Sequence, residues 1–206
     1  MTIKLQDIRS LYDSSQYCSV DEVKLLSTAS NHLLLLHSNI RSIQKNFSKL
    51  YQLLCDISVP PDFIALTETW VTKTSHFKPN LPGYNFISSP STSNRSGGVA
   101  FFLKERLQYQ IRSDLNFSCI NCENLWVEIH QSNNKTAIVG IIYCHPGYNY
   151  TDFFSCFEEL LYNLNLLNKT YFICEDFNIN YYNDEDNTDY KNMIASTGSH
   201  YQPNSN

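Results

Sequence analysis

The sequence has few glycines, few charges and no long apolar run, and each shortage excludes a class of protein. Six glycines among 206 residues exclude a collagen-like or glycine-rich linker architecture. The longest uninterrupted aliphatic run, residues 33–36, falls far short of the ~20 apolar residues that a membrane-spanning helix needs. The amino-terminal residues contain no apolar signal-peptide core. We therefore expect an intracellular protein, nuclear or cytoplasmic, that is neither secreted nor associated with a membrane.

Positive charge is scarce as well. Lys and Arg together number 15 and Asp and Glu 20, so the formal net charge at pH 7 is −5. This balance argues against a protein that binds nucleic acid by bulk positive charge. It does not argue against an enzyme that handles phosphate groups through a metal ion, because the ion itself supplies positive charge.

Cysteine is present, but without a recognisable framework. The seven cysteines are odd in number and scattered along the chain. Cys119 and Cys122 form a lone C-x-x-C pair, with no second pair at zinc-binding spacing. We therefore expect reduced, mostly buried thiols, as in intracellular proteins.

The remaining composition suits a packed domain, because 42% of the residues are hydrophobic and 14% are aromatic. Residues 1–30 show only loose helical spacing, and we expect a weakly structured extension with at most a short helix. Residues 32–38 and 62–67 are unbroken apolar runs, typical of buried strands. Between them, the apolar positions of 43–57 recur at the spacing of an amphipathic helix, with Ser42 as its N-cap.

The second half of the chain has short strand patterns, then one helical pattern and a last strand. We expect strands at 84–88, 99–103, 107–112, 125–130, 136–143 and 171–174, and a helix at 153–167. The strands before the helix are typical of an antiparallel meander. The order βαβ, β meander, βαβ predicts an α/β domain in which helices cover mixed sheets.

Polar side chains follow the predicted buried strands at the points where these strands end. These residues are Asn39, Glu68, Tyr143, His145, Asp176 and Asn178. Each one alone has an ordinary structural explanation, as a turn residue, a loop start or a core tyrosine. Strand ends converge at one edge of a sheet in α/β folds, so we expect these side chains to gather there. The side-chain oxygen atoms of the two Asn, the Glu and the Asp would suit Mg²⁺ or Mn²⁺ and not zinc.

Six segments together form a pattern that is more specific than any one of them. They are LLLLHSNIRSI (33–43), PDFIALTETWV (61–71), NRSGGVAFFLK (94–104), CENLWVEI (122–129), IVGIIYCHP (138–146) and YFICEDFNI (171–179). In their order and at about their spacing, these segments resemble the endonuclease/exonuclease/phosphatase superfamily, and more narrowly the endonuclease domain of LINE-type (non-LTR) retrotransposons. The resemblance implies an α/β fold, an α+β four-layer sandwich of two packed mixed β-sheets flanked by helices. The domain would span residues 31–206, after an extension at 1–30.

The resemblance also implies the roles of individual residues. Asn39 and Glu68 stand where relatives bind the divalent metal, Mg²⁺ or Mn²⁺, which offsets the charge that develops on the phosphate. Tyr143 stands where relatives contact the scissile phosphate, and His145 is a further candidate for such a contact. Asp176 and Asn178 stand where relatives have the Asp and Asn that orient or deprotonate the attacking water and steady the phosphate.

Two features depart from the pattern of the relatives. Their final Ser-Asp-His motif has no counterpart here, since His200 lies in GSHYQ without a preceding Asp. Glu175 replaces the Gly that precedes the "DFN" Asp, where Gly permits a tight turn. We interpret the chain as a C-terminally incomplete copy of such a domain, impaired in catalysis.

The leading hypothesis is a divalent-metal-dependent phosphodiesterase that nicks DNA. One alternative is another phosphoesterase of the superfamily, such as a repair nuclease, a lipid phosphodiesterase or an inositol-phosphate phosphatase. Another is an inactive, domesticated remnant that only binds nucleic acid or protein. Four basic residues are candidates for phosphate contacts, or else form an ordinary solvated face. They are Arg95, Lys104, Arg106 and Arg112.

Overall fold

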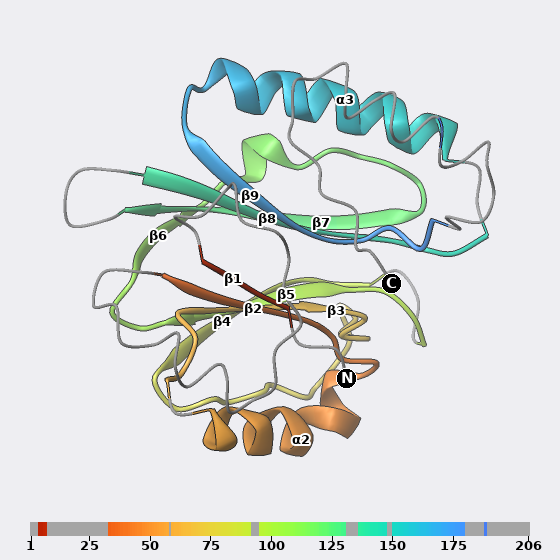
Figure 1. The fold of residues 1–206 in the computed structure, drawn as a ribbon. Coiled ribbons are helices and arrows are strands. Elements are labelled where there is room, and N and C mark those ends of the chain that lie inside the picture. The colour runs from red at the N-terminus through yellow and green to blue at the C-terminus, as the bar shows by residue number, and fades with distance from the viewer. Residues whose placement is uncertain are drawn as a thin grey trace. The chain divides into compact units, whose positions relative to one another are not determined.

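The computed structural model describes residues 4–7, 33–57, 59–91, 95–130, 136–147, 150–179 and 188. The chain divides into two compact units, Met1–Leu107 and Gln108–Asn206. Each unit is built on one mixed β-sheet and one long helix (Figure 1). Among the described helices, none has the length and apolar character needed to cross a membrane.

The sheet of the first unit has five strands in the order β1-β2-β3-β5-β4. They are β1 (Lys4–Asp7), β2 (Leu34–Asn39), β3 (Phe63–Thr67), β4 (Tyr84–Ser89) and β5 (Val99–Lys104). β2 and β3 are parallel, and the other neighbours are antiparallel. The chain passes from β2 to β3 through α2 (Ile43–Asp56), which confirms the first predicted βαβ unit.

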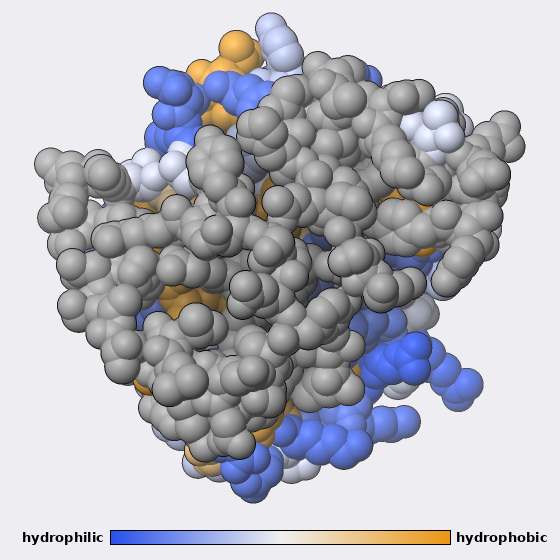
Figure 2. All heavy atoms as spheres, viewed as in Figure 1, coloured by the Kyte–Doolittle hydropathy of each residue, from blue (hydrophilic) through white to orange (hydrophobic). Residues whose placement is uncertain are grey.

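α2 is held to its sheet by the apolar face that the sequence predicts. Ile43 and Leu50 are buried against the inner side chains of β2, β3 and β5. The Phe47 ring lies 6.2 Å from the Phe102 ring of β5. The opposite side of the helix carries polar residues, and hydrophilic atoms are visible along the bottom of Figure 2, where Figure 1 places α2.

Two local expectations in the first unit need correction. Ser42 is the N-cap residue of α2, as predicted, but its side chain makes no capping hydrogen bond. Its backbone has φ 79°, and its N–H donates to the Glu68 carbonyl. Residues Lys4–Asp7 form a strand and not part of a helix. They pair with β2 as its antiparallel neighbour, and this long-range pairing overrides a loose helical spacing.

The sheet of the second unit has four strands in the order β6-β7-β8-β9. They are β6 (Gln108–Ile111), β7 (Cys122–His130), β8 (Thr136–Cys144) and β9 (Thr170–Asp176). A short 3-10 helix, η1 (Ser113–Leu115), lies between β6 and β7. β8 and β9 are parallel and are joined through α3 (Thr151–Leu166), which confirms the second βαβ unit.

α3 covers its sheet with an aromatic cluster. Phe153 and Phe157 of the helix pack on Phe177, with the Phe153 and Phe177 ring centroids 4.9 Å apart. Trp126 of β7 is fully buried in the same cluster. The predicted fold class, α/β with two mixed sheets and covering helices, is therefore confirmed.

The predicted single meander is wrong in one respect, because its strands divide between the two sheets. β4 and β5 join the first sheet, where β5 pairs with β3. β6, β7 and β8 form the antiparallel part of the second sheet. Strand patterns reveal which faces are buried but not which strand is the hydrogen-bonded neighbour.

The cysteines also differ from the expectation of reduced thiols. Cys122 and Cys144 form a disulfide between β7 and β8, where they are directly opposed with their Cα atoms 4.2 Å apart. In the described part of the chain, the cysteines outside this disulfide carry thiols: Cys55, Cys119, Cys156 and Cys174. The paired cysteines are 22 residues apart in sequence, and only the register of the two strands brings them together.

Candidate functional site

Asn39 and Glu68 meet at the carboxyl ends of two parallel strands. Asn39 is the last residue of β2, and Glu68 directly follows β3. The register pairs Asn39 with Thr67, so the two side chains start from neighbouring positions. The Asn39 Nδ2 atom donates a hydrogen bond of 2.6 Å to Oε1 of Glu68. The structure thus brings together the two residues predicted to bind a metal.

The backbone around this pair is held firmly, although Glu68 has φ 51° in the left-handed region. The Glu68 carbonyl accepts a 2.8 Å hydrogen bond from the N–H of Ser42. The following N–H, of Thr69, donates to the Gly98 carbonyl at 3.0 Å. A non-glycine residue in this region is strained unless its surroundings hold it. The contacts on both sides of Glu68 therefore fix where its carboxylate points.

The donor atoms of the pair fit a hard divalent cation. Glu68 offers a carboxylate, and Asn39 carries an amide oxygen that accepts a 3.2 Å hydrogen bond from the N–H of Arg41. In phosphate-handling sites Mg²⁺ is held by only one or two carboxylates, and water and substrate phosphate supply the other ligands. Among the described residues no group of three or more His, Cys, Asp or Glu side chains is placed to hold a metal. Carboxylate and amide oxygens are ligand types of Mg²⁺ and Mn²⁺, whereas zinc sites are built mainly from Cys and His.

A second set of predicted residues gathers in the second unit, at the carboxyl ends of β8 and β9. Tyr143 and Asp176 are register partners on these two parallel strands. Tyr143 is only 2% exposed. Asn178 has φ 53°, and its Nδ2 atom donates 2.8 Å to the Cys144 carbonyl. Asn adopts this backbone conformation more readily than most residues, so Asn178 ties the loop after β9 to the end of β8.

His145 directly follows β8 and is fixed by a buried carboxylate. Its Nε2 atom lies 3.1 Å from Oε1 of Glu123, which is 8% exposed. Its backbone N–H donates to the Asn121 carbonyl at 2.9 Å. The His145 ring lies edge-on to Tyr143, with centroids 5.0 Å apart. The other oxygen of Glu123, Oε2, is buried and makes no hydrogen bond to any described residue.

The predicted site residues therefore form two groups, one on each sheet. Asn39 and Glu68 belong to the first unit, and the remaining four to the second: Tyr143, His145, Asp176 and Asn178. The expectation of one common sheet edge is wrong, because β2–β3 and β8–β9 are the parallel pairs of two different sheets. Their roles in binding and catalysis stay predictions.

Glu175 does not distort a turn. It lies within β9 as the register partner of Ile142, and within residues 170–179 the residue with a positive φ is Asn178. The strand simply runs on through the position where relatives have Gly, and no glycine-specific conformation is needed there. His200, which has no preceding Asp, lies outside the described residues.

Three of the four basic candidates for phosphate contacts are engaged in ion pairs. Lys104 and Arg106 both pair with Asp62, which is 3% exposed. Arg112 pairs with Asp114 at 2.7 Å and also with Glu128. The fourth candidate, Arg95, lies on the wall of a cavity at the start of α2.

Sequence reasoning missed two residues near these groups, Glu123 and Trp70. Both lie within segments that carry the family resemblance, so the signal was present, but no role was assigned to them. Glu123 faces Tyr143 across the β7–β8 ladder and contacts His145. Trp70 lies two residues after Glu68 and lines the cavity at the start of α2.

Solved structures of low identity share this fold. One is the endonuclease domain of TRAS1, a telomere-specific non-LTR retrotransposon (11% identity, 83% of this chain and 73% of that domain, TM-score 0.58). A second is the human Nocturnin catalytic domain with bound sulfate (16% identity, 79% of this chain and 68% of that domain, TM-score 0.53). A third is D. rerio TDP2 in complex with a single-strand DNA product (12% identity, 81% of this chain and 65% of that chain, TM-score 0.51).

No protein-family model and no curated protein matches the sequence. The likeness to solved structures therefore concerns the fold, which is shared over about four-fifths of this chain. The resemblance of the six sequence segments and the arrangement of the strands agree on the same architecture. The chain has the α/β fold of the endonuclease/exonuclease/phosphatase superfamily, the fold of the retrotransposon endonuclease domain among others.

Proposed function

We propose that this protein is a divalent-metal-dependent phosphodiesterase that nicks DNA. The observation that carries the proposal is the Asn39–Glu68 pair, joined at 2.6 Å on the carboxyl ends of β2 and β3. The fold supports it, because nucleases and other phosphoesterases share this architecture. Of the solved structures that share the fold, one is the endonuclease domain of TRAS1 and another is TDP2 bound to a DNA product.

The chemistry follows from the donor atoms. A Mg²⁺ or Mn²⁺ ion would offset the negative charge that develops on the phosphoryl and leaving oxygens. Glu68 and Asn39 would hold this ion, and the hydrogen bond between them keeps the carboxylate oriented. Asp176 is the candidate that accepts a proton from the attacking water. The candidates for contacts with the phosphate are Tyr143, His145 and Asn178.

A plasmid-nicking assay tests the proposal. The 206-residue chain is incubated with supercoiled DNA in Mg²⁺, in Mn²⁺ and in EDTA. We expect nicked circles with either metal and none in EDTA. Glu68→Gln removes the anionic ligand while it keeps the side-chain shape, and it should lower the nicking rate by at least about a hundredfold. Exposed Glu105→Gln in the same unit is the matched control and should nick at the wild-type rate.

Three results would contradict the proposal. One is nicking that persists in EDTA, because the metal would then be unnecessary. Another is equal nicking by the wild type and Glu68→Gln. The third is cleavage of a small phosphoester by a chain that leaves plasmid DNA intact, since this would favour another phosphoesterase of the same fold.

A further inference from the structure

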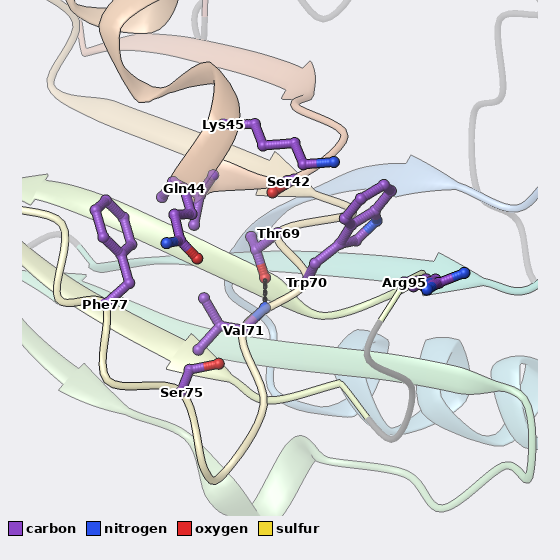
Figure 3. A pocket seen from close by; sticks show the side chains of 10 residues that line it. Ser42, Gln44, Lys45, Thr69, Trp70, Val71, Ser75, Phe77 and Arg95 are labelled. Atoms are coloured by element: carbon purple, nitrogen blue, oxygen red, sulfur yellow. Dashed lines mark hydrogen bonds between the residues drawn. The ribbon is translucent and has the colours of Figure 1, made fainter.

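A cavity of about 150 Å³ lies in the second unit, apart from the cavity at the start of α2 that Figure 3 shows. Its walls come from the turn before β7, the end of β8 and the start of α3. Three of the residues that line it are cysteines, namely the disulfide-bonded Cys122 and Cys144 and the thiol Cys119. A disulfide and a thiol on the wall of one cavity can react with each other and with thiols from solution.

Cys122 is within reach of two different partners. Across the β7–β8 ladder it directly opposes Cys144. Along the chain it closes a tight turn, in which its N–H donates a 3.3 Å hydrogen bond to the Cys119 carbonyl. The first and fourth residues of such a turn have Cα atoms less than about 7 Å apart, and disulfides span Cα distances of about 4.4–6.8 Å. The backbone therefore allows Cys122 to pair with Cys119 as well as with Cys144.

The turn that carries the Cys119 thiol is open to solvent. Ile120, the next residue, is 91% exposed, and Cys119 itself is half-buried. A further cysteine, Cys156 of α3, is close to this turn, and its Sγ atom donates to the Ser118 carbonyl at 3.8 Å. Burial raises the pKa of the Cys156 thiol, and the neighbouring Cys119 raises it further, so Cys156 stays protonated near neutral pH. Because the thiolate is the nucleophile, Cys119 is the thiol that can attack the disulfide.

The disulfide lies among the candidate phosphate contacts at the end of β8. Cys144 is the residue between Tyr143 and His145. The Cys144 carbonyl accepts the 2.8 Å hydrogen bond from Asn178. On the other strand, Glu123 directly follows Cys122 and holds His145 through the 3.1 Å contact described above. Breaking the bond to Cys144 removes the covalent tie between β7 and β8 at the point where these residues gather.

We propose that Cys119, Cys122 and Cys144 form a thiol–disulfide exchange site that reacts with small thiols. The Cys119 thiolate attacks Sγ of Cys122, a new S–S bond forms between them, and the bond from Cys122 to Cys144 breaks. The electron pair of the broken bond stays on Sγ of Cys144, which takes up the proton that Cys119 has lost, so the exchange involves no net oxidation. A small dithiol reduces the site fully, because its two thiols become one disulfide while the protein disulfide becomes two thiols.

Disulfide mapping tests the exchange without any assay of activity. The full chain is equilibrated in a glutathione redox buffer, alkylated and digested, and mass spectrometry identifies which cysteines are linked. We expect the wild type to contain both the Cys122–Cys144 and the Cys119–Cys122 pairing. Cys144→Ser should contain the Cys119–Cys122 pairing alone, and Cys119→Ser the Cys122–Cys144 pairing alone. Cys156→Ser removes a protonated thiol close to the same turn and, as the matched control, should leave both pairings as in the wild type.

A second measurement compares the oxidised wild type with the same protein reduced by dithiothreitol, so it does not depend on the folding of a variant. The backbone N–H of His145 donates to the Asn121 carbonyl just beyond the disulfide. Hydrogen exchange of this amide, followed by NMR, should be at least about tenfold faster in the reduced form. Buried Val139, in the middle of β8, is the internal control and should exchange equally in both forms. Nicking should be severalfold slower in the reduced form, and only this last expectation rests on the proposed function.

The exchange site is wrong if Cys144→Ser shows no Cys119–Cys122 pairing, or if the wild type contains the Cys122–Cys144 pairing alone at every ratio of reduced to oxidised glutathione. A disulfide that persists in dithiothreitol would show that small thiols do not reach the cavity. Equal hydrogen exchange at His145 in the two forms, or equal nicking by them, would overturn the link to the candidate site. A chain with the expected pairings that nicks plasmid DNA in neither form would overturn the proposed activity and leave the exchange site intact.

Discussion

At the scale of single residues, the buried carboxylate of Glu128 shows how this protein accommodates charge. Glu128 is 5% exposed and pairs with both Arg112 and Lys169. Burial raises the pKa of this carboxyl, but the hydrogen bonds from Lys169 and Arg112 outweigh burial and leave the pKa below its ordinary value of 4.5. The ionised form is therefore favoured by folding.

The sign of the pKa shift predicts how stability depends on pH. A carboxyl whose pKa is lowered by folding stabilises the native state above its unfolded pKa, and this contribution is lost as the pH falls through the folded value. We expect Glu128→Gln to lower the free energy of unfolding by about 2 kcal/mol at neutral pH. The difference from the wild type should stay constant down to about pH 5 and shrink below 4.5.

Urea unfolding of both proteins between about pH 3 and pH 7 measures this difference. Glu159→Gln, at an exposed position of α3, is the matched control and should change little at any pH. A difference that grows as the pH falls would show that Glu128 does not stabilise the fold in its ionised form.

At the scale of elements, β8 depends on a glycine for its contact with β7. Gly140 is the register partner of Trp126 on the neighbouring strand. A Cβ atom at Gly140 would lie 2.1 Å from the nearest atom of the Trp126 indole, far inside van der Waals contact. The indole therefore packs directly over the backbone of β8, in the centre of the aromatic cluster that holds α3.

This close approach predicts that Gly140→Ala is strongly destabilising. The added methyl group must displace a fully buried indole, and overpacking of this kind costs about 3 kcal/mol. Thermal unfolding followed by circular dichroism checks the expected loss. In a Trp126→Phe background the smaller ring leaves room, so the same substitution should cost much less. Equal costs in the two backgrounds would show that the indole does not set the constraint.

At the scale of the whole molecule, 15 Lys and Arg stand against 20 Asp and Glu, which gives a net charge of −5. Four of the basic residues are neutralised by acidic neighbours, namely Lys104, Arg106, Arg112 and Lys169. A net negative surface repels the phosphate backbone of DNA. We therefore expect affinity for DNA to depend on few phosphate contacts and on the metal more than on bulk charge.

This predicts a weak dependence of DNA binding on salt. Each phosphate contact on a single strand contributes about −0.7 to the slope of log K against log salt concentration, so two contacts would give about −1.4. Anisotropy titrations of a labelled single-stranded oligothymidylate of about ten nucleotides from about 50 to 200 mM KCl measure the slope. A slope steeper than about −4 would mean that a large basic surface binds the strand.

Much of the local structure could be predicted from the sequence. Unbroken apolar runs located β3 and β8, and the spacing of apolar residues located α2 and α3, because these patterns reflect burial of one face or two. The close approach of Asn39 and Glu68 also followed, since both come at the ends of strands joined by one helix. The elements follow from local periodicity, and the Asn39–Glu68 contact follows from a single βαβ unit, although the two residues are 29 positions apart in the chain.

Other features depended on partners far away in the chain. No pattern in 119–144 distinguished the Cys122–Cys144 pair from free thiols, because the register of β7 and β8 decides it. Ser42 is a residue type that commonly caps helices and stands at the N-cap position, yet its side chain makes no capping hydrogen bond. Its N–H donates to the carbonyl of Glu68, which is distant in the chain. The residues that line the cavity at the start of α2 come from three separate segments, so only folding brings them together.

The sequence by itself determined the elements of this protein, the α/β class and the positions of its candidate metal ligands, because apolar periodicity and strand ends are written in consecutive residues. Only the tertiary structure decided the division of the strands between two sheets, the disulfide, and the cavity beside Glu68. Strand pairing and cavities depend on register and side-chain packing between distant segments, and these have no signature in local periodicity.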